Sequence, residues 1–293
     1  MQEIVIISGK GGTGKTSLVA AFAQLSKTEL VVADCDVDAA DLYLLMHPDF
    51  RLEQAFLSGE KAQLDQNGCD QCGLCQAACR FEAIELRAEQ YTINALDCEG
   101  CGYCARVCPT GAISMVEQKA GDWYRSTTRF GGAMVHARLG IAAENSGKLV
   151  SLVKNEARKL AQRKGLETIL VDGSPGIGCP VISSLSGADL AILVTEPTIS
   201  GFHDLKRVRR LVEKFHIRIG CIINKFDLNP EITDQIQDWL DRESISLVAR
   251  LPYSDVFTEA MTRGQTAIEY SNGTLSQSIR NSWDAILQLN NER

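Results

Sequence analysis

The sequence lacks long apolar runs, an excess of positive charge and any histidine cluster. No window approaches the roughly 18 uninterrupted apolar residues that a membrane-spanning helix needs. Lysine and arginine number 30 against 37 aspartates and glutamates, which gives a formal net charge of -7. That charge argues against nucleic acid or an anionic membrane as a general partner, because both require a basic surface. The four histidines form no ligand spacing, so no role is assigned to them.

An export signal is also missing, and this bears on the cysteines. The amino-terminal residues read as a strand leading into a glycine loop and not as a charged leader before an apolar segment. A cytoplasmic location without stable membrane insertion is therefore expected. Thiols are kept reduced there, so the eleven cysteines are expected to be metal ligands instead of disulfides.

Most of the cysteines form two copies of one spacing pattern. Each copy reads C-x2-C-x2-C-x3-C, and CGLCQAACRFEAI matches CGYCARVCPTGAI at further positions, which indicates a duplicated unit. Thiolates at this spacing suit iron-sulfur clusters, where the fourth cysteine of each copy binds the other cluster. We therefore predict two 4Fe-4S clusters, one on Cys69, Cys72, Cys75 and Cys108 and the other on Cys98, Cys101, Cys104 and Cys79.

Structural zinc is the alternative for this block. Zinc also uses paired CxxC units, but each ion needs only four ligands and no symmetric repeat of eight cysteines. Arg80 stands where the second copy has Pro109, a departure that removes no ligand. Cys35 and Cys221 lie in apolar strand sequences and are expected to be structural.

A phosphate-binding loop follows the first apolar run. QEIVIIS reads as a buried strand, residues 9–16 fit G-x-x-x-x-G-K-T, and SLVAAFAQL continues as a helix. Backbone N–H groups in such a loop point at phosphate oxygens, and the helix start adds its positive dipole end. Lys15 is expected to contact the outer phosphates and Thr16 to bind Mg²⁺. The predicted nucleotide-binding residues here are Gly11, Gly12, Thr13, Gly14, Lys15, Thr16 and Ser17.

Later strand ends carry further candidates. VVADCDVDAADL places Asp34, Asp36 and Asp38 after a second apolar strand. ETILVDGSPGIG ends its strand in Asp172, a Walker B position whose carboxylate holds Mg²⁺ through water. CIINKFDL ends another strand in Asn224.

The lysine at the front of the loop gives the chain a family resemblance. With Lys10, KGGTGKT resembles the deviant Walker A ATPases, the family of MinD, ParA, Mrp and the nitrogenase iron protein. The resemblance implies that Lys10 contacts the nucleotide of a second subunit, so an ATP-bound homodimer, or a heterodimer with a related ATPase, is expected. An ordinary exposed loop lysine is the alternative.

The same resemblance assigns roles to the strand ends. It implies that Asp36 helps to hold Mg²⁺ and the attacking water, that the Gly176 amide senses the terminal phosphate, and that Asn224 recognises adenine. Asp227 resembles the guanine-reading aspartate of GTPases, so GTP stays open beside ATP. Cys179 is similar in position to a subunit-bridging cluster cysteine of the nitrogenase iron protein, but it has no partner cysteine. A packed small residue is the expectation for it.

The order of the motifs indicates an insertion. The phosphate loop precedes the cysteines and Asp172 follows them, so we expect an ATPase domain in residues 1–57 and 118–293 and a ferredoxin-like domain in residues 58–117. LSGEKAQLDQNG and EQKAGDW bound it, as polar stretches that typically accept insertions. The fold class is α/β, a mainly parallel, doubly wound P-loop NTPase sheet with a small α+β insert. The chain resembles MinD-like ATPases with an inserted ferredoxin domain over nearly its whole length.

The predicted function couples two chemistries. ATP binding and hydrolysis, with Lys10, Lys15, Asp36 and Asp172 as the catalytic residues, would drive dimerisation and gate electron transfer through the clusters to a redox or iron-sulfur acceptor protein. One alternative is an Mrp-like cluster carrier, although relatives of that type use a CxxC pair outside any ferredoxin. The other is a MinD-like spatial organiser whose clusters sense redox state.

Overall fold

The chain divides into two compact units. The computed structural model describes residues 1–140 and 146–291. The first unit, here called the sheet unit, contains Met1–Gln54, Asp122–Leu139 and the chain from Ser146 onward, and the second, the cysteine unit, is formed chiefly by Ala55–Gly121. The cysteine unit is therefore inserted within the sequence of the sheet unit.

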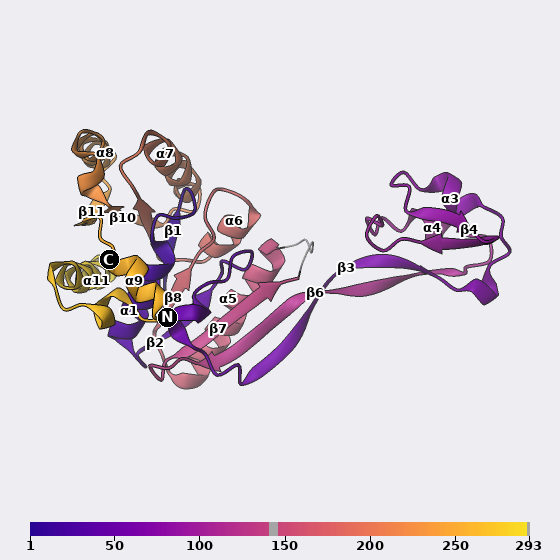
Figure 1. Cartoon of the computed structure of the whole chain (residues 1–293), viewed down its shortest axis with the longest axis horizontal. Helices are drawn as coiled ribbons and strands as arrows, with labels where there is room; N and C mark the ends of the chain where they lie inside the picture. The colour runs from indigo at the N-terminus through magenta and orange to yellow at the C-terminus, as the bar shows by residue number, and fades with distance from the viewer. Residues whose placement is uncertain (141–145, 292–293) are drawn as a thin grey trace. The chain divides into compact units, whose positions relative to one another are not determined.

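A large sheet organises the first unit (Figure 1). Its strand order is β11-β10-β9-β1-β8-β2-β7-β6-β3, and every pair from β11 to β7 is parallel. Only residues 128–132 connect the neighbours β6 and β7, so these two must be antiparallel, because a parallel pair needs a crossover of a dozen or more residues. The strands are β1 Gln2–Ser8, β2 Leu30–Asp34, β3 Leu52–Leu64, β6 Ile113–Thr127, β7 Ala133–Leu139, β8 Thr168–Asp172, β9 Leu190–Thr195, β10 Arg218–Asn224 and β11 Ser246–Leu251.

Helices cover both faces of this sheet, as expected for parallel strands that are apolar throughout. Ile4 and Ile6 of β1 pack into a core with α1, α10 and α11, so the alternate residues Val5 and Ile7 face the other side. There α5, α6 and α7 contact β2, β1 and β9. The helices are α1 Lys15–Ser26, α2 Tyr43–Met46, α5 Ser146–Lys164, α6 Cys179–Leu185, α7 Ile199–Glu213, α8 Pro230–Arg242, α9 Val256–Thr262, α10 Ala267–Tyr270 and α11 Thr274–Asn291.

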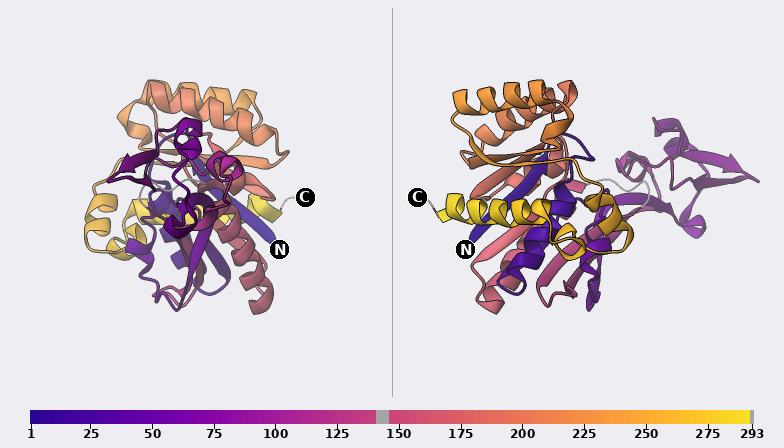
Figure 2. Two further views of the ribbon diagram at one scale, coloured as in Figure 1. Left: turned by 90° about the vertical axis from the view of Figure 1, so that its right-hand side faces the viewer. Right: turned by 60° about the vertical axis from the view of Figure 1, so that its left-hand side comes forward.

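The helix that follows the glycine loop is fixed by an aromatic stack. Phe22 of α1 and Trp283 of α11 stack with ring centroids 5.0 Å apart, and both side chains are buried. Gln2 Nε2 donates to the Asn290 backbone carbonyl, and Asn290 Nδ2 donates to Gln2 Oε1. These bonds tie the end of α11 to the start of β1, and Figure 2 shows the end of α11 near the amino terminus. The beginning of the sheet and the last helix therefore hold α1 in place.

The cysteine unit repeats one local structure. Each copy of the cysteine pattern forms a short helix, α3 Leu74–Ala78 or α4 Tyr103–Val107, preceded by a left-handed glycine. Gly73 has φ 75° and Gly102 has φ 72°, a conformation that glycine adopts without steric cost. An antiparallel pair, β4 Ile84–Arg87 and β5 Gln90–Ile93, lies between the copies. Cys75, Ile84 and Ile113 form the buried core of the cysteine unit.

Both polar stretches expected as boundaries of the insertion lie largely within strands. Residues 57–64 continue β3 and residues 117–123 lie in β6, so each of these strands contains residues of both units. Most of β3 is exposed on both faces. Without a buried face it has no apolar alternation, which is the signal that identifies a strand in sequence.

No helix within residues 1–140 and 146–291 is long and apolar enough to cross a membrane.

The basic stretch LKRVRR lies in α7, whose residues Leu205, Val208 and Val212 are buried. Its charges therefore occupy the solvent face of an amphipathic helix.

Replacing Phe22 by alanine is expected to lower the free energy of unfolding by about 3–5 kcal/mol, because it leaves a cavity beneath Trp283. Leu228, with 58% of its surface exposed, is the matched control, and Leu228→Ala should change stability by less than about 0.5 kcal/mol. Chemical denaturation of the three proteins measures both effects. Equal stability of the two variants would contradict the assigned packing.

Candidate functional site

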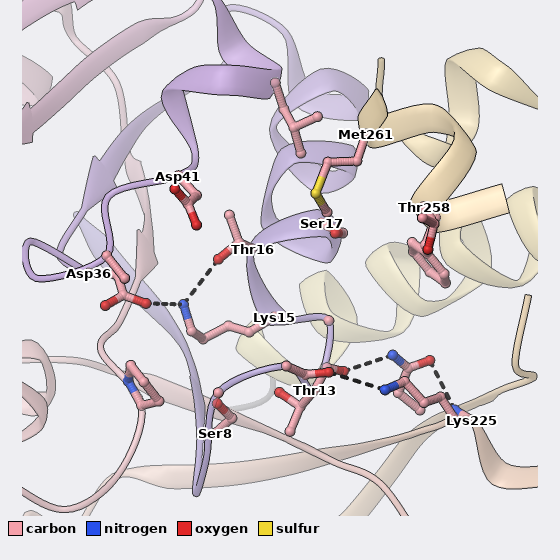
Figure 3. Close-up of a pocket in the computed structure, with 18 of the residues that line it drawn as sticks. Ser8, Thr13, Lys15, Thr16, Ser17, Asp36, Asp41, Lys225, Thr258 and Met261 are labelled. Atoms are coloured by element: carbon pink, nitrogen blue, oxygen red, sulfur yellow. Dashed lines mark hydrogen bonds and ion pairs between the residues drawn. The ribbon is translucent and has the colours of Figure 1, made fainter. Parts of the chain in front are cut away.

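The glycine loop between β1 and α1 encloses one side of a cavity of about 440 Å³. Gly12 and Gly14 have φ values of 78° and 90°, in the region that favours glycine. A Cβ at Gly14 would also lie 2.5 Å from Asn224 Nδ2. Figure 3 shows the loop side chains around this cavity.

The cavity gathers most of the residues predicted from sequence. Tyr253, Ser254, Phe257, Thr258 and Met261, on α9 and the segment before it, line the opposite wall and were not predicted. Lys10, Asp172 and Gly176 are outside the lining. The predicted residues in the lining are Gly11, Gly12, Thr13, Gly14, Lys15, Thr16, Ser17, Asp36 and Asn224.

The buried ammonium group of Lys15 lies beside carboxylates at or just after the strand ends (Figure 3). The Lys15 Nζ atom is 3.3 Å from Asp36 Oδ2, 3.3 Å from Thr16 Oγ1, and in an ion pair with Asp172 Oδ1. Lys15 and Asp172 are almost fully buried, and Asp36 is 8% exposed. The structure thus brings together the lysine, the hydroxyl and the two carboxylates that the sequence placed on three separate segments.

The same cluster shifts the acid–base equilibria of its members. Burial acts to lower the pKa of Lys15, but the carboxylates of Asp172 and Asp36 outweigh it and raise that pKa. Burial raises the pKa of Asp36, partly opposed by Lys15. Burial and the nearby Asp172 raise the pKa of Asp34 well above its ordinary value. The cluster therefore carries more carboxylate than one lysine neutralises.

Several buried oxygen atoms at the site have no protein partner among the described residues. They are Thr13 Oγ1, Asp34 Oδ2 and Asp172 Oδ2. Buried polar atoms without partners are costly, and at functional sites they commonly serve a ligand or ion. Their chemistry, hydroxyl and carboxylate oxygen, suits a hard cation such as Mg²⁺.

The loop after β8 is held by hydrogen bonds to neighbouring strands. The Gly176 amide, at a residue with φ 94°, donates to Ser8 O at 2.8 Å. Ser174 Oγ donates to Cys35 O at 2.7 Å. Pro175 reaches the cavity lining, so the loop borders the site while the predicted Gly176 amide is bonded within the protein.

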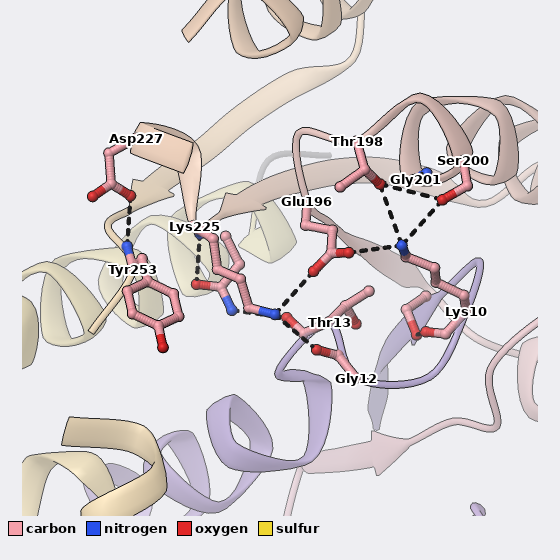
Figure 4. Close-up of polar contacts among 12 residues, drawn as sticks. Lys10, Gly12, Thr13, Glu196, Thr198, Ser200, Gly201, Lys225, Asp227 and Tyr253 are labelled. Carbon is pink, nitrogen blue, oxygen red and sulfur yellow. Dashed lines mark hydrogen bonds and ion pairs between the residues drawn. The ribbon is translucent and has the colours of Figure 1, made fainter. Parts of the chain in front are cut away.

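The far side of the loop is held by the residues after β10. Asn224 Nδ2 donates to Thr13 O at 2.8 Å, and Lys225 Nζ donates to Gly12 O at 3.1 Å. Asp227 Oδ1 accepts from the Tyr253 amide at 2.6 Å (Figure 4). The Asp227 carboxylate thus positions the cavity wall and does not line the cavity.

Lys10 is bonded within its own chain, as Figure 4 shows. Its Nζ atom pairs with Glu196 Oε1 at 2.7 Å and donates to Thr198 Oγ1 and Ser200 Oγ, each at 3.2 Å. Glu196 also pairs with Lys225 Nζ at 2.9 Å. Sequence reasoning missed Glu196, although a polar residue directly after the apolar strand LAILVT, at the ligand-binding edge of a parallel sheet, was an available signal.

The eight repeated cysteines all lie in the cysteine unit. Cys75 interacts electrostatically with Cys69 and Cys72, and burial is the main cause of its raised pKa. Cys104 interacts in the same way with Cys98 and Cys101.

The last cysteine of the first copy lies with the second copy. A small cavity is lined by Cys79 together with Cys98, Cys101 and Cys104. Cys79, Cys104 and Cys108 all pack against the apolar cluster that contains Cys75. Throughout the described part of the chain, no three His, Cys, Asp or Glu side chains are placed to hold a single metal ion.

The remaining cysteines divide into two classes. Cys35 and Cys221 are buried in strand regions, as expected, and burial raises the pKa of both thiols. Cys179 is exposed, so the expectation of a packed small residue is wrong. It is the first residue of α6, directly after the Gly178 cap, where its side chain points away from the core that holds Val181 and Leu185.

A parallel sheet whose first strand leads through a glycine loop and a buried lysine into a helix defines a P-loop nucleotide-binding protein. Residues 4–267 match the model of the CobQ/CobB/MinD/ParA nucleotide binding domain, and the chain belongs to this family. It is 33% identical over 231 residues to an uncharacterized protein of Methanocaldococcus jannaschii, covering 78% of this chain and 80% of that protein.

Solved structures share the fold. The septum site-determining protein MinD of Pyrococcus horikoshii, complexed with Mg-ADP, superposes with a TM-score of 0.59 at 20% identity, over 99% of this chain and 97% of that one. The cell division ATPase MinD of Pyrococcus furiosus gives a TM-score of 0.58 at 19% identity, over 98% of this chain and 99% of that one.

Asp34→Asn is expected to stabilise the nucleotide-free protein increasingly as pH rises above 3.8, the ordinary pKa of an aspartate. The folded pKa is raised, so between the two values the folded state binds more protons and its stability falls with rising pH. Asparagine keeps the acceptor for the Asp36 amide and removes this loss, a gain of about 1–3 kcal/mol near neutral pH.

Unfolding curves across pH, taken as differences from the unsubstituted protein, measure this gain. Asp234→Asn, at an exposed residue of α8 outside the cluster, is the matched control and should not reproduce this gain. A flat difference curve for Asp34→Asn would show that the site does not destabilise that carboxylate.

Proposed function

We propose that this protein is an ATPase in which ATP-dependent dimerisation gates electron transfer through two 4Fe-4S clusters held by the cysteine unit. The observation that carries the proposal is the presence, in one chain, of a phosphate loop with its buried Lys15 cluster and a duplicated eight-cysteine unit. In the sequence, the unit is inserted between Asp36 and Asp172, the two carboxylates that Lys15 contacts.

Adenine is the base favoured at the far wall of the cavity. A guanine-reading aspartate needs a free carboxylate directed at the base, and Asp227 instead accepts the Tyr253 amide outside the lining. The family likeness includes a MinD structure complexed with Mg-ADP. Both observations support ATP over GTP. Asn224 separately donates to Thr13 O and so holds the loop backbone.

Hydrolysis would use the residues around Lys15. The loop amides and Lys15 would hold the phosphates, while Thr16 and Asp172 would hold Mg²⁺, with Asp36 beside the attacking water. Bound Mg²⁺ supplies charge neutralisation at the phosphate oxygens. The orphaned Asp172 Oδ2 supports this assignment. Because Lys15 is paired with both carboxylates, phosphate and Mg²⁺ together would replace those pairs with new ones.

The cysteine positions support cross-ligation of two clusters. Cys79 lines one cavity with the three leading cysteines of the second copy, which is the arrangement that cross-ligation requires for that cluster. A single ion draws its ligands to one point, whereas a 4Fe-4S cluster takes one thiolate on each iron and so needs cysteines spread around it. An arrangement without a single-ion site is therefore compatible with clusters.

A route from nucleotide to clusters runs along the chain connections. Val37, next to Asp36, accepts a hydrogen bond from the Leu139 amide at the end of β7. β7 pairs with β2 and follows β6, and β6 leads out of the cysteine unit. A change of the loop after β2 on ATP binding would therefore act first on β7, the sheet neighbour of β6, and through β7 on the strand that leads out of the insertion.

The likeness to MinD supports a second candidate, a spatial organiser whose clusters only sense redox state. The two candidates differ in whether nucleotide changes the clusters. An Mrp-like carrier is less supported, because every CxxC of the chain belongs to the cysteine unit.

Replacing ADP with a non-hydrolysable ATP analogue is expected to shift the cluster midpoint potentials of the anaerobically prepared protein. A shift of about 59 mV in a one-electron couple corresponds to about 1.4 kcal/mol of coupling. Redox titration in each nucleotide state measures it. Identical potentials would favour the organiser.

Lys10→Met should bind nucleotide yet abolish the shift, because it removes the proposed link between subunits. Lys164→Met, at an exposed position at the end of α5, is the matched control and should keep the full shift. A Lys10→Met protein with an unaltered shift would separate the clusters from dimerisation.

Cys79→Ser is expected to halve the iron content and to remove the same cluster as Cys101→Ser. The double variant Cys79→Ser/Cys101→Ser should then also retain about half the iron, whereas Cys72→Ser/Cys79→Ser should lose nearly all of it. Iron analysis and the absorbance of anaerobic preparations measure this, with Cys179→Ser as the exposed control. Complete loss in the first double variant would refute cross-ligation.

A further inference from the structure

The Glu196 carboxylate pairs with two lysines: Lys10, which is part of the phosphate loop, and Lys225, which bonds to the loop backbone (Figure 4). Its carboxylate is 2.7 Å from Lys10 Nζ through Oε1 and 2.9 Å from Lys225 Nζ through Oε2. Lys10 belongs to the front of the loop, and Lys225 donates to Gly12 O in the middle of it. One carboxylate directly after β9 therefore bridges both lysines.

The bridge is partly shielded from water. The side chain of Glu196 is 14% exposed, against 31% for Lys10 and 27% for Lys225. Burial acts to raise the pKa of Glu196, but the two lysines outweigh it and lower that pKa, so the group is ionised at neutral pH. Thr198 Oγ1 and Ser200 Oγ complete the environment of Lys10 with neutral acceptors.

All three N–H donors of the Lys10 ammonium are occupied while these bonds persist. Its ammonium has three hydrogens, and Glu196, Thr198 and Ser200 provide three acceptors on its own subunit. Contact with a phosphate on a second subunit would require at least the charged partner to be given up. Glu196 would then keep Lys225 as its counter-charge, so leaving Lys10 free does not strand a buried carboxylate.

We propose that Glu196 is a positioning residue that holds Lys10 on its own subunit and competes with the partner's nucleotide for it, thereby setting the ATP concentration at which the dimer forms. This inference rests on the proposed ATP-dependent dimer. Lys225 serves as the permanent partner of the carboxylate, and Lys10 is the one that leaves.

The first test is made on the nucleotide-free chain. Glu196→Gln keeps the size of the side chain and removes its charge, so the rate at which an amine-reactive reagent modifies Lys10, followed by mass spectrometry, should rise at least about twofold. Glu213→Gln, which removes a carboxylate of α7 that is paired with Arg209, is the matched control and should leave the rate unchanged. An unchanged rate in Glu196→Gln would overturn the hold on Lys10.

The second test measures dimerisation with a non-hydrolysable ATP analogue by sedimentation. Glu196→Gln should lower the dimer dissociation constant by about 2- to 30-fold, since two partly exposed ion pairs are released per dimer. In a Lys10→Met background, which removes the proposed contact between subunits, the same substitution should leave dimerisation as weak as in Lys10→Met alone, because the competition is then gone. An effect that persists without Lys10, or a dissociation constant that stays the same or rises, would overturn the proposal.

The two tests also separate the inference from the function on which it rests. If Glu196→Gln accelerates labelling of Lys10 but neither protein dimerises with the analogue, the ATP-dependent dimer fails while the hold on Lys10 stands. If the unsubstituted protein dimerises and Glu196→Gln does not alter the dissociation constant, the dimer stands and the competition is wrong.

Discussion

The nucleotide site of the sheet unit is organised by a buried ion cluster at the carboxyl ends of three adjacent strands. The order β1-β8-β2 places Asp172 between the loop that carries Lys15 and the segment that carries Asp34 and Asp36. Three carboxylates at one buried edge repel each other, and Lys15 provides the one positive charge that contacts Asp36 and Asp172. Such a cluster costs stability, which the apolar core around α1 offsets. Its cost is understandable where phosphate and a divalent cation are to be bound.

Two separate sets of bonds hold the phosphate loop, one on each side of it. On one side Lys15 ties it to the acids of β8 and β2. On the other, Asn224 and Lys225 bond to its carbonyl oxygens, and Glu196 links Lys225 to Lys10. A ligand that draws Lys15 away changes the bonds on the first side, and one that draws Lys10 away changes those on the second.

The cysteine unit is ordered by different means. Each half turns at a left-handed glycine into a short helix and leaves it through an extended cysteine, Cys79 or Cys108. These are local features that depend little on the sheet. The strands β3 and β6, which contain residues of both units, connect the two units covalently. The Leu139 amide of β7, the sheet neighbour of β6, donates to Val37 O beside Asp36.

The sequence alone determined the features that depend on neighbours along the chain. The phosphate loop, the alternation of apolar strands with helices, and the repeated cysteine spacing are short-range patterns, because backbone conformation and ligand reach within a few residues dictate them. They were enough to predict the α/β fold, the insertion and the residues that line the cavity from Gly11 to Ser17.

Only the tertiary structure decided what distant segments do to one another. It paired Lys10 with Glu196, turned Asp227 toward Tyr253, exposed Cys179, and made strands of the polar stretches beside the insertion. The physical reason is that strand order brings residues together across separations such as that between Lys15 and Asp172, and no local pattern records which strands become neighbours. The chemistry of a charged side chain can therefore be read from the sequence, whereas the residue it pairs with is determined by the fold.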